Sequence, residues 1–131
     1  HESVSGNTMT EQQLHRSVAD YLRVALRPPT IWTTIGHGGG GKTRGAILKR
    51  LGVQAGWPDI LVIHPNNILT SQVIGIELKA KKGTQSRAQK LLQHSFDMAG
   101  GRYSVCHSID DVETALMESN VPLHGSIRGI P

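Results

Sequence analysis

Two short apolar segments separated by a turn constrain the fold of this 131-residue chain more than any other feature. Residues 59–63 and 72–79 are rich in isoleucine, valine and leucine, and Pro65-Asn66-Asn67 lies between them. β-Branched residues favour strands, and a proline followed by asparagines favours a turn. We therefore expect two neighbouring strands that pair as a hairpin or lie side by side in one sheet.

Amphipathic helices are predicted on both sides of this strand pair. Apolar side chains recur at helical spacing over 11–26, where Thr10 and Gln13 form a capping-box pattern. A second helical period covers 86–99, with one side formed by Ala88, Leu91, Leu92, Ser95 and Met98. Further strands are expected over 31–35 and 102–107, and further helices over 44–51 and 110–118. The order α-β-α-β-β-α-β-α predicts an α/β domain.

Charge is distributed unevenly along the chain. The whole sequence has a net charge of +4, but the segment from residue 42 to residue 90 carries nine basic residues and two acids, a local net charge of +7. The basic residues are Lys42, Arg44, Lys49, Arg50, Lys79, Lys81, Lys82, Arg87 and Lys90. A basic segment of this kind suits a nucleic-acid backbone, so we expect all of these except Lys79 to contact phosphates.

The two acids of this basic segment are Asp59 and Glu77. Because side chains alternate along a strand, Glu77 and Lys79 face the same side, and pairing around the turn can bring Asp59 to them. Close carboxylates repel unless a cation lies between them, and Mg²⁺ prefers such oxygen ligands. A lysine beside the ion could orient or deprotonate a water for phosphodiester hydrolysis. The alternative for an acid and a lysine two residues apart is a solvated ion pair.

Three motifs together resemble the VRR-NUC (virus-type replication-repair nuclease) domain of the PD-(D/E)xK nuclease superfamily. The motifs are G-V-Q-A-G-W-P-D over 52–59, I-E-L-K over 76–79, and Gly83 with S-R-A-Q over 86–89. The resemblance runs from about Thr10 to about Leu116. It implies a restriction-endonuclease-like α-β-β-β-α-β core with a mixed central sheet flanked by helices. The chain is similar to stand-alone phage and bacterial members of the family, which cut branched DNA such as Holliday junctions, and to the nuclease domain of the Fanconi-associated nuclease.

The resemblance also implies roles for individual residues. Asp59, Glu77 and the backbone carbonyl of Leu78 would ligate Mg²⁺ or Mn²⁺, and Lys79 would be the catalytic lysine. Glu11 would be the first-helix glutamate of the family, which reaches the metal directly or through water.

Gln89, on the following helix, would support the site from behind the metal ligands. Two positions depart from the family pattern: His15 stands where a residue like glutamine is expected, and the glycine run at 36–41 is longer than usual.

The implied function is metal-dependent endonuclease cleavage of branched DNA, as in DNA repair. Cutting a four-way junction needs two active sites, so we expect a homodimer. We expect a cytoplasmic location in a bacterial or phage-infected cell, and neither a membrane partner nor a nucleotide cofactor. Residues 1–9 are expected to be an expression remnant or a disordered N-terminus, 10–118 the nuclease domain, and 119–131 a C-terminal tail.

Two other functions remain open at this stage. Residues 36–43 read G-H-G-G-G-G-K-T, which satisfies the Walker A pattern of a P-loop NTPase. Asp59 begins its strand instead of ending it, unlike a Walker B acid, so a DNA-contacting loop with His37 near the substrate is favoured over a P-loop. A non-catalytic nucleic-acid-binding module on the same fold is the second alternative. The single cysteine, Cys106, excludes an internal disulfide and is expected in the core.

Overall fold

The computed structural model describes residues 9–36, 41–67 and 69–124, without the side chains of residues 41 and 42. The helices are α1 (Glu11–Ala25), α2 (Gly41–Arg50), α3 (Arg87–Met98) and α4 (Ile109–Glu118). The strands are β1 (Ile31–Thr34), β2 (Ile60–Pro65), β3 (Ser71–Leu78) and β4 (Arg102–Cys106). The order of elements is the predicted one. Among the described residues, none of the helices has the length and apolar character to cross a bilayer.

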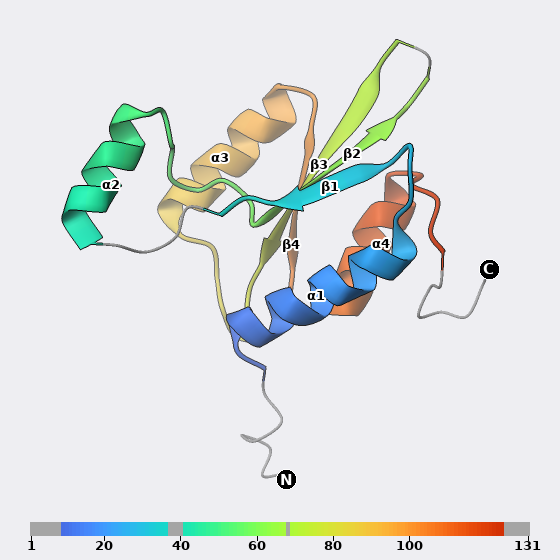
Figure 1. The fold of residues 1–131 in the computed structure, drawn as a ribbon, viewed down its shortest axis with the longest axis horizontal. Helices are drawn as coiled ribbons and strands as arrows, with labels where there is room; N and C mark the ends of the chain where they lie inside the picture. The colour runs from blue at the N-terminus through green and yellow to red at the C-terminus, as the bar shows by residue number, and fades with distance from the viewer. Residues whose placement is uncertain (1–8, 37–40, 68, 125–131) are drawn as a thin grey trace, which may run out of the picture.

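The strands form one mixed sheet in the order β1-β2-β3-β4. β2 pairs antiparallel with β1 and with β3, while β4 pairs parallel with β3 after the chain has passed through α3. Figure 1 shows α1 and α4 together on one side of the sheet, α3 on the other, and α2 standing apart. The predicted hairpin and the predicted mixed sheet flanked by helices are confirmed.

The main hydrophobic core lies between the sheet and the α1–α4 pair. Alternate side chains of the sheet, including Ile60, Ile74 and Ile76, pack there against the apolar stripes of both helices. Cys106 is buried in this core, as predicted, and burial raises the pKa of its thiol to about 12. Packing continues past the end of α4, because Val121 joins the core.

The opposite face of the sheet is covered by α3. Phe96 is the buried residue of this helix. Of the side that the helical period predicted, Ala88 and Leu92 are half-buried, whereas Leu91 and Met98 are exposed. The ring of Phe96 packs edge-on against Trp57 and Tyr103, which lie before β2 and on β4. Because of these long-range aromatic contacts, the face of α3 that packs against the sheet carries Phe96 and not Leu91 or Met98.

Candidate active site

Asp59 and Glu77 are brought together by the register of the β2–β3 hairpin. Ile60 pairs with Ile76, so Asp59, one residue earlier, lies across from Glu77, one residue later. Directly opposed residues on antiparallel strands point to the same face. The Leu78 N–H donates to Oδ2 of Asp59 at 2.7 Å, which fixes this carboxylate beside the main chain that follows Glu77.

Two glycines let the segment before Asp59 lie close to its neighbours. Gly56 has a φ of +91°, and a side chain there would collide with the main chain of Ala88 at the start of α3. At Gly75 of β3, a Cβ would lie 2.6 Å from Cγ of Pro58. Glycine avoids both collisions and tolerates the positive φ. The glycine and the proline of the G-x-P-D pattern therefore lie in close packing contacts, which place the start of β2 directly against α3 and β3.

Glu77 is held on both carboxylate oxygens in a buried position. Its side chain is 3% exposed. The Gln89 side-chain amide donates to Oε2 at 2.5 Å, and Nζ of Lys79 lies 3.7 Å from the same oxygen. The hydroxyl of Tyr103 lies 3.5 Å from Oε1. Glu77 and Lys79 thus form a largely buried ion pair, and the solvated surface pair of the alternative interpretation is excluded.

The orientation of Gln89 follows from a capping box at the start of α3. The Ser86 N–H donates to Oε1 of Gln89 at 2.8 Å, and the Gln89 N–H donates to the Ser86 hydroxyl at 3.2 Å. With its carbonyl oxygen engaged in the cap, the side-chain amide presents its NH₂ group to Glu77. The S-x-x-Q pattern therefore both begins the helix and positions a hydrogen-bond donor at the site.

Negative charge accumulates around Glu77. Burial above all, and then the carboxylates of Asp59 and Glu11, raise the pKa of Glu77 to about 7, against the opposing effect of Lys79. One ammonium does not balance these acids, and a divalent cation would. Asp59, Glu77 and the Leu78 carbonyl offer the oxygen ligands that Mg²⁺ and Mn²⁺ prefer, so these residues fit the implied metal.

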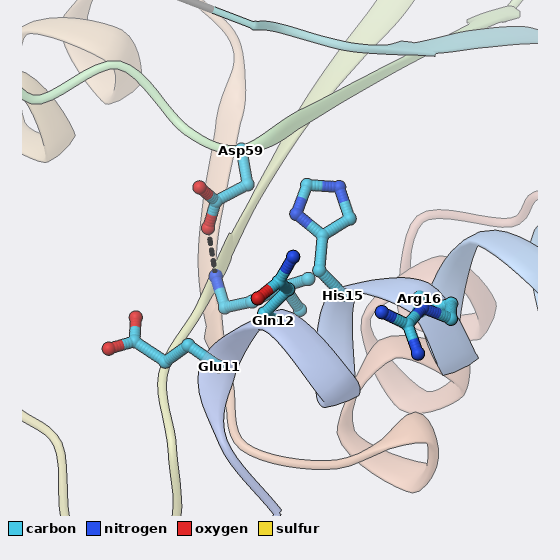
Figure 2. A pocket seen from close by; sticks show the side chains of 6 residues that line it. Glu11, Gln12, His15, Arg16 and Asp59 are labelled. Atoms are coloured by element: carbon cyan, nitrogen blue, oxygen red, sulfur yellow. Dashed lines mark hydrogen bonds between the residues drawn. The ribbon is translucent and has the colours of Figure 1, made fainter. Parts of the chain in front are cut away.

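A cavity of about 420 Å³ adjoins Asp59. It is lined by Glu11, Gln12, His15, Arg16, Asp59 and Leu78. In Figure 2, Glu11 of α1 and Asp59 direct their carboxylates to the same side, while Arg16 points away. Among the described residues, no three side chains of the His, Cys, Asp and Glu types are grouped to hold a metal ion. The structure therefore brings Asp59 and Glu77 together, and Glu11 lies on the wall of the cavity that Asp59 also lines.

His15 occupies the wall of this cavity where the family pattern favours a residue like glutamine. Its Nε2 lies 3.0 Å from the hydroxyl of Thr34 on β1. The histidine at this position therefore links α1 to β1.

The predicted phosphate contacts lie on three exposed segments. Arg44, Lys49 and Arg50 are exposed on α2; Lys81 and Lys82 are exposed directly after β3; Arg87 and Lys90 are exposed on α3. Lys81 and Lys82 follow the strand that carries Glu77, and Arg87 and Lys90 lie on either side of Gln89 in α3. The side chain of Lys42, and residues 37–40 with His37 and most of the glycine run, lie outside the described residues.

Tyr103 is a site residue that sequence reasoning missed. It is a single tyrosine in a predicted strand, 26 residues from Glu77 in the chain. The parallel β3–β4 register aligns Tyr103 with Gly75, which places it on the same face as Glu77. This register would have identified Tyr103 as a site residue, but the sequence alone does not give the register.

Comparison with known proteins supports the fold. A solved structure described as a VRR_NUC domain protein superimposes with a TM-score of 0.63 at 21% sequence identity, covering 84% of this chain and 87% of the other. A scan against protein-family models found no match. A search of curated proteins found none either. The predicted VRR-NUC-like, restriction-endonuclease-like fold is confirmed by the structural match.

Proposed function

We propose that this chain is a divalent-metal-dependent nuclease that hydrolyses phosphodiester bonds in DNA. The VRR-NUC-like fold supports a nuclease-type domain. The observation that carries the proposal is the convergence of Asp59, Glu77 and Lys79 at the meeting point of β2 and β3. Asp59 and Glu77 are the two acids of the basic segment, and they are the pair that the fold brings together.

Each residue has a definite task in this proposal. Asp59, Glu77 and the Leu78 carbonyl would hold Mg²⁺ or Mn²⁺, which when bound supplies Lewis-acid activation of a water and of the phosphate. Lys79, with Nζ 3.7 Å from Glu77, would orient that water or take its proton. Glu11 would act through water from the wall of the cavity, and Gln89 keeps Glu77 in its rotamer.

The substrate we propose is branched DNA, held by its phosphates. Lys81, Lys82, Arg87 and Lys90 would contact the backbone next to the site, and the basic residues of α2 would contact it farther away. A symmetric homodimer would supply one site for each of the two strands cut at a junction.

A cleavage assay with three additives tests the proposal. A labelled four-way junction and a linear duplex of the same sequence are incubated with the protein in Mn²⁺, in EDTA, or in Mn²⁺ with ATP. We expect cleavage of the junction in Mn²⁺, none in EDTA, and no change with ATP. The Lys79→Ala protein should bind the junction as tightly as the wild type while its cleavage is lost.

Two results would replace the proposal with one of its alternatives. Salt-sensitive binding with no cleavage in Mn²⁺ would indicate a non-catalytic nucleic-acid-binding module. ATP turnover that is lost in Lys42→Ala and unaffected by Asp59→Ala would indicate a P-loop NTPase.

A further inference from the structure

We propose that Tyr103 is a positioning residue that holds the two carboxylate-bearing segments of the site in register. The inference rests on the proposed nuclease function and adds a residue to it. The phenolic O–H donates to the Gly56 carbonyl at 3.0 Å and lies 3.5 Å from Oε1 of Glu77. One hydroxyl on β4 therefore touches both Glu77 and the segment that leads, three residues later, to Asp59.

The ring of Tyr103 is itself fixed. The centroid of its ring lies 5.8 Å from that of the Phe96 ring in an edge-on arrangement. The centroids of the Phe96 and Trp57 rings lie 6.0 Å apart in the same arrangement. Tyr103 as a whole is buried, with 4% of its surface exposed. Edge-on aromatic pairs of this kind restrain ring orientation. The hydroxyl is therefore presented to Gly56 and Glu77 from a rigid support.

The two oxygens of Glu77 depend on different partners. Oε2 receives the Gln89 amide and faces Lys79, whereas the contact described for Oε1 is the Tyr103 hydroxyl. Removing that hydroxyl would release Oε1 and, at the same time, the Gly56 carbonyl. The hydrogen bond from Leu78 to Asp59 depends on the position of the segment just before β2, which Gly56 belongs to. Without the hydroxyl, the carboxylates of Glu77 and Asp59 should therefore both be held less firmly in place.

The test is Tyr103→Phe, which keeps the ring contacts and removes only the hydroxyl. The chain offers a matched control in Tyr21→Phe, because Tyr21 is also buried and donates to a buried glutamate, Glu113, at 2.9 Å on the other face of the sheet. Three quantities are measured for each protein: kcat and KM on the junction, Mn²⁺ affinity by calorimetry, and hydrogen exchange of the Leu78 amide.

We expect Tyr103→Phe to lower kcat and Mn²⁺ affinity by about 10- to 100-fold, as is usual when a partner of a metal ligand is lost. KM for DNA should stay unchanged, and the Leu78 amide should exchange faster. Tyr21→Phe should leave all three quantities at wild-type values. In a Glu77→Gln background, Tyr103→Phe should bring a smaller further loss of Mn²⁺ affinity than in the wild type, because only its effect through Gly56 and Asp59 remains.

Wild-type kcat, Mn²⁺ affinity and Leu78 exchange in Tyr103→Phe would overturn the inference, as would equal losses in Tyr21→Phe. A wild-type protein that neither cuts DNA nor binds Mn²⁺ would instead refute the proposed function. In that case the Leu78 exchange rate still decides whether Tyr103 positions the Asp59 carboxylate.

Discussion

The two faces of the sheet each bury a glutamate that contacts a tyrosine hydroxyl. Glu77 of β3 lies under α3 beside Tyr103, and Glu113 of α4 receives the hydroxyl of Tyr21 from α1. Both glutamates are almost completely shielded from solvent. Burial and a tyrosine partner are therefore common to the two positions, and neither property distinguishes a functional site from a structural one.

What differs is the other charges that converge on each glutamate. Glu77 has Asp59 opposite it and Lys79 at 3.7 Å, and Asp59 lines a cavity together with Glu11. Glu113 lies on the apolar face of α4, between the buried residues Val112 and Leu116. A second carboxylate and a lysine, rather than burial, distinguish the α3 side as the candidate site for the proposed metal-dependent chemistry.

Replacing each glutamate in turn is the strongest way to break this comparison. Glu77→Gln should lower cleavage of the junction by about 10²- to 10⁴-fold, because a metal ligand and the partner of Lys79 are removed. Glu113→Gln should leave the cleavage rate within about twofold, since it touches no reacting group. Single-turnover cleavage rates measure both effects. Equal losses in the two variants would show that the faces do not differ as described.

The pH dependence of stability gives the next largest effect. The pKa of Glu77 rises from its ordinary value of 4.5 to about 7 in the folded chain, chiefly through burial. Between these values the folded state binds more protons than the unfolded state, so folding becomes less favourable as pH rises. The shift corresponds to about 3 kcal/mol. Urea unfolding in EDTA from pH 4.5 to pH 8 should show this decline in the wild type.

Glu77→Gln provides the control for the pH experiment. Its free energy of unfolding should lack this decline, so that the difference between the two proteins grows with pH up to about 7. If the wild type instead gained stability relative to Glu77→Gln over this range, the pKa of Glu77 would be lowered in the folded chain. The conclusion that negative charge is in excess at the site would then be refuted.

The smallest expected effect concerns the basic residues near Glu77. Lys81→Ala combined with Lys82→Ala should weaken junction binding roughly tenfold and reduce the salt slope by about 2, because two phosphate contacts are lost. Arg23→Ala with Arg27→Ala removes the same charge at the far end of α1 from Glu11. This control should bind almost as the wild type does in a fluorescence-anisotropy titration. Equal losses of affinity in the two double variants would indicate that binding depends on net charge and not on where the basic residues lie.

Much of the fold follows from local sequence patterns. The capping boxes at Thr10 and Ser86 and the turn after Pro65 are local, and the structure shows both caps and the hairpin. The sequence also predicted that pairing around the turn could bring Asp59 to Glu77, but not the register itself, Ile60 with Ile76, because Pro65-Asn66-Asn67 does not fix the length of the loop. The family resemblance then supplied the chemical interpretation of this pair, which composition alone does not give.

The parts that escaped prediction depend on contacts between distant segments. The buried side of α3 is set by Phe96, whose partners Trp57 and Tyr103 come from before β2 and from β4. Tyr103 reaches Gly56 across 47 residues of sequence. No periodicity reports such contacts, because they arise only when the parallel strand β4 is placed beside β3.

A calorimetric titration with Mn²⁺ tests most directly whether the Asp59–Glu77 pair is the metal-binding centre. The wild type, Asp59→Asn and Glu113→Gln are titrated in the absence of DNA, so the result does not depend on catalysis. The account predicts that the wild type and Glu113→Gln bind Mn²⁺ alike and that Asp59→Asn loses at least about tenfold in affinity. Unchanged affinity in Asp59→Asn, or a loss confined to Glu113→Gln, would contradict it.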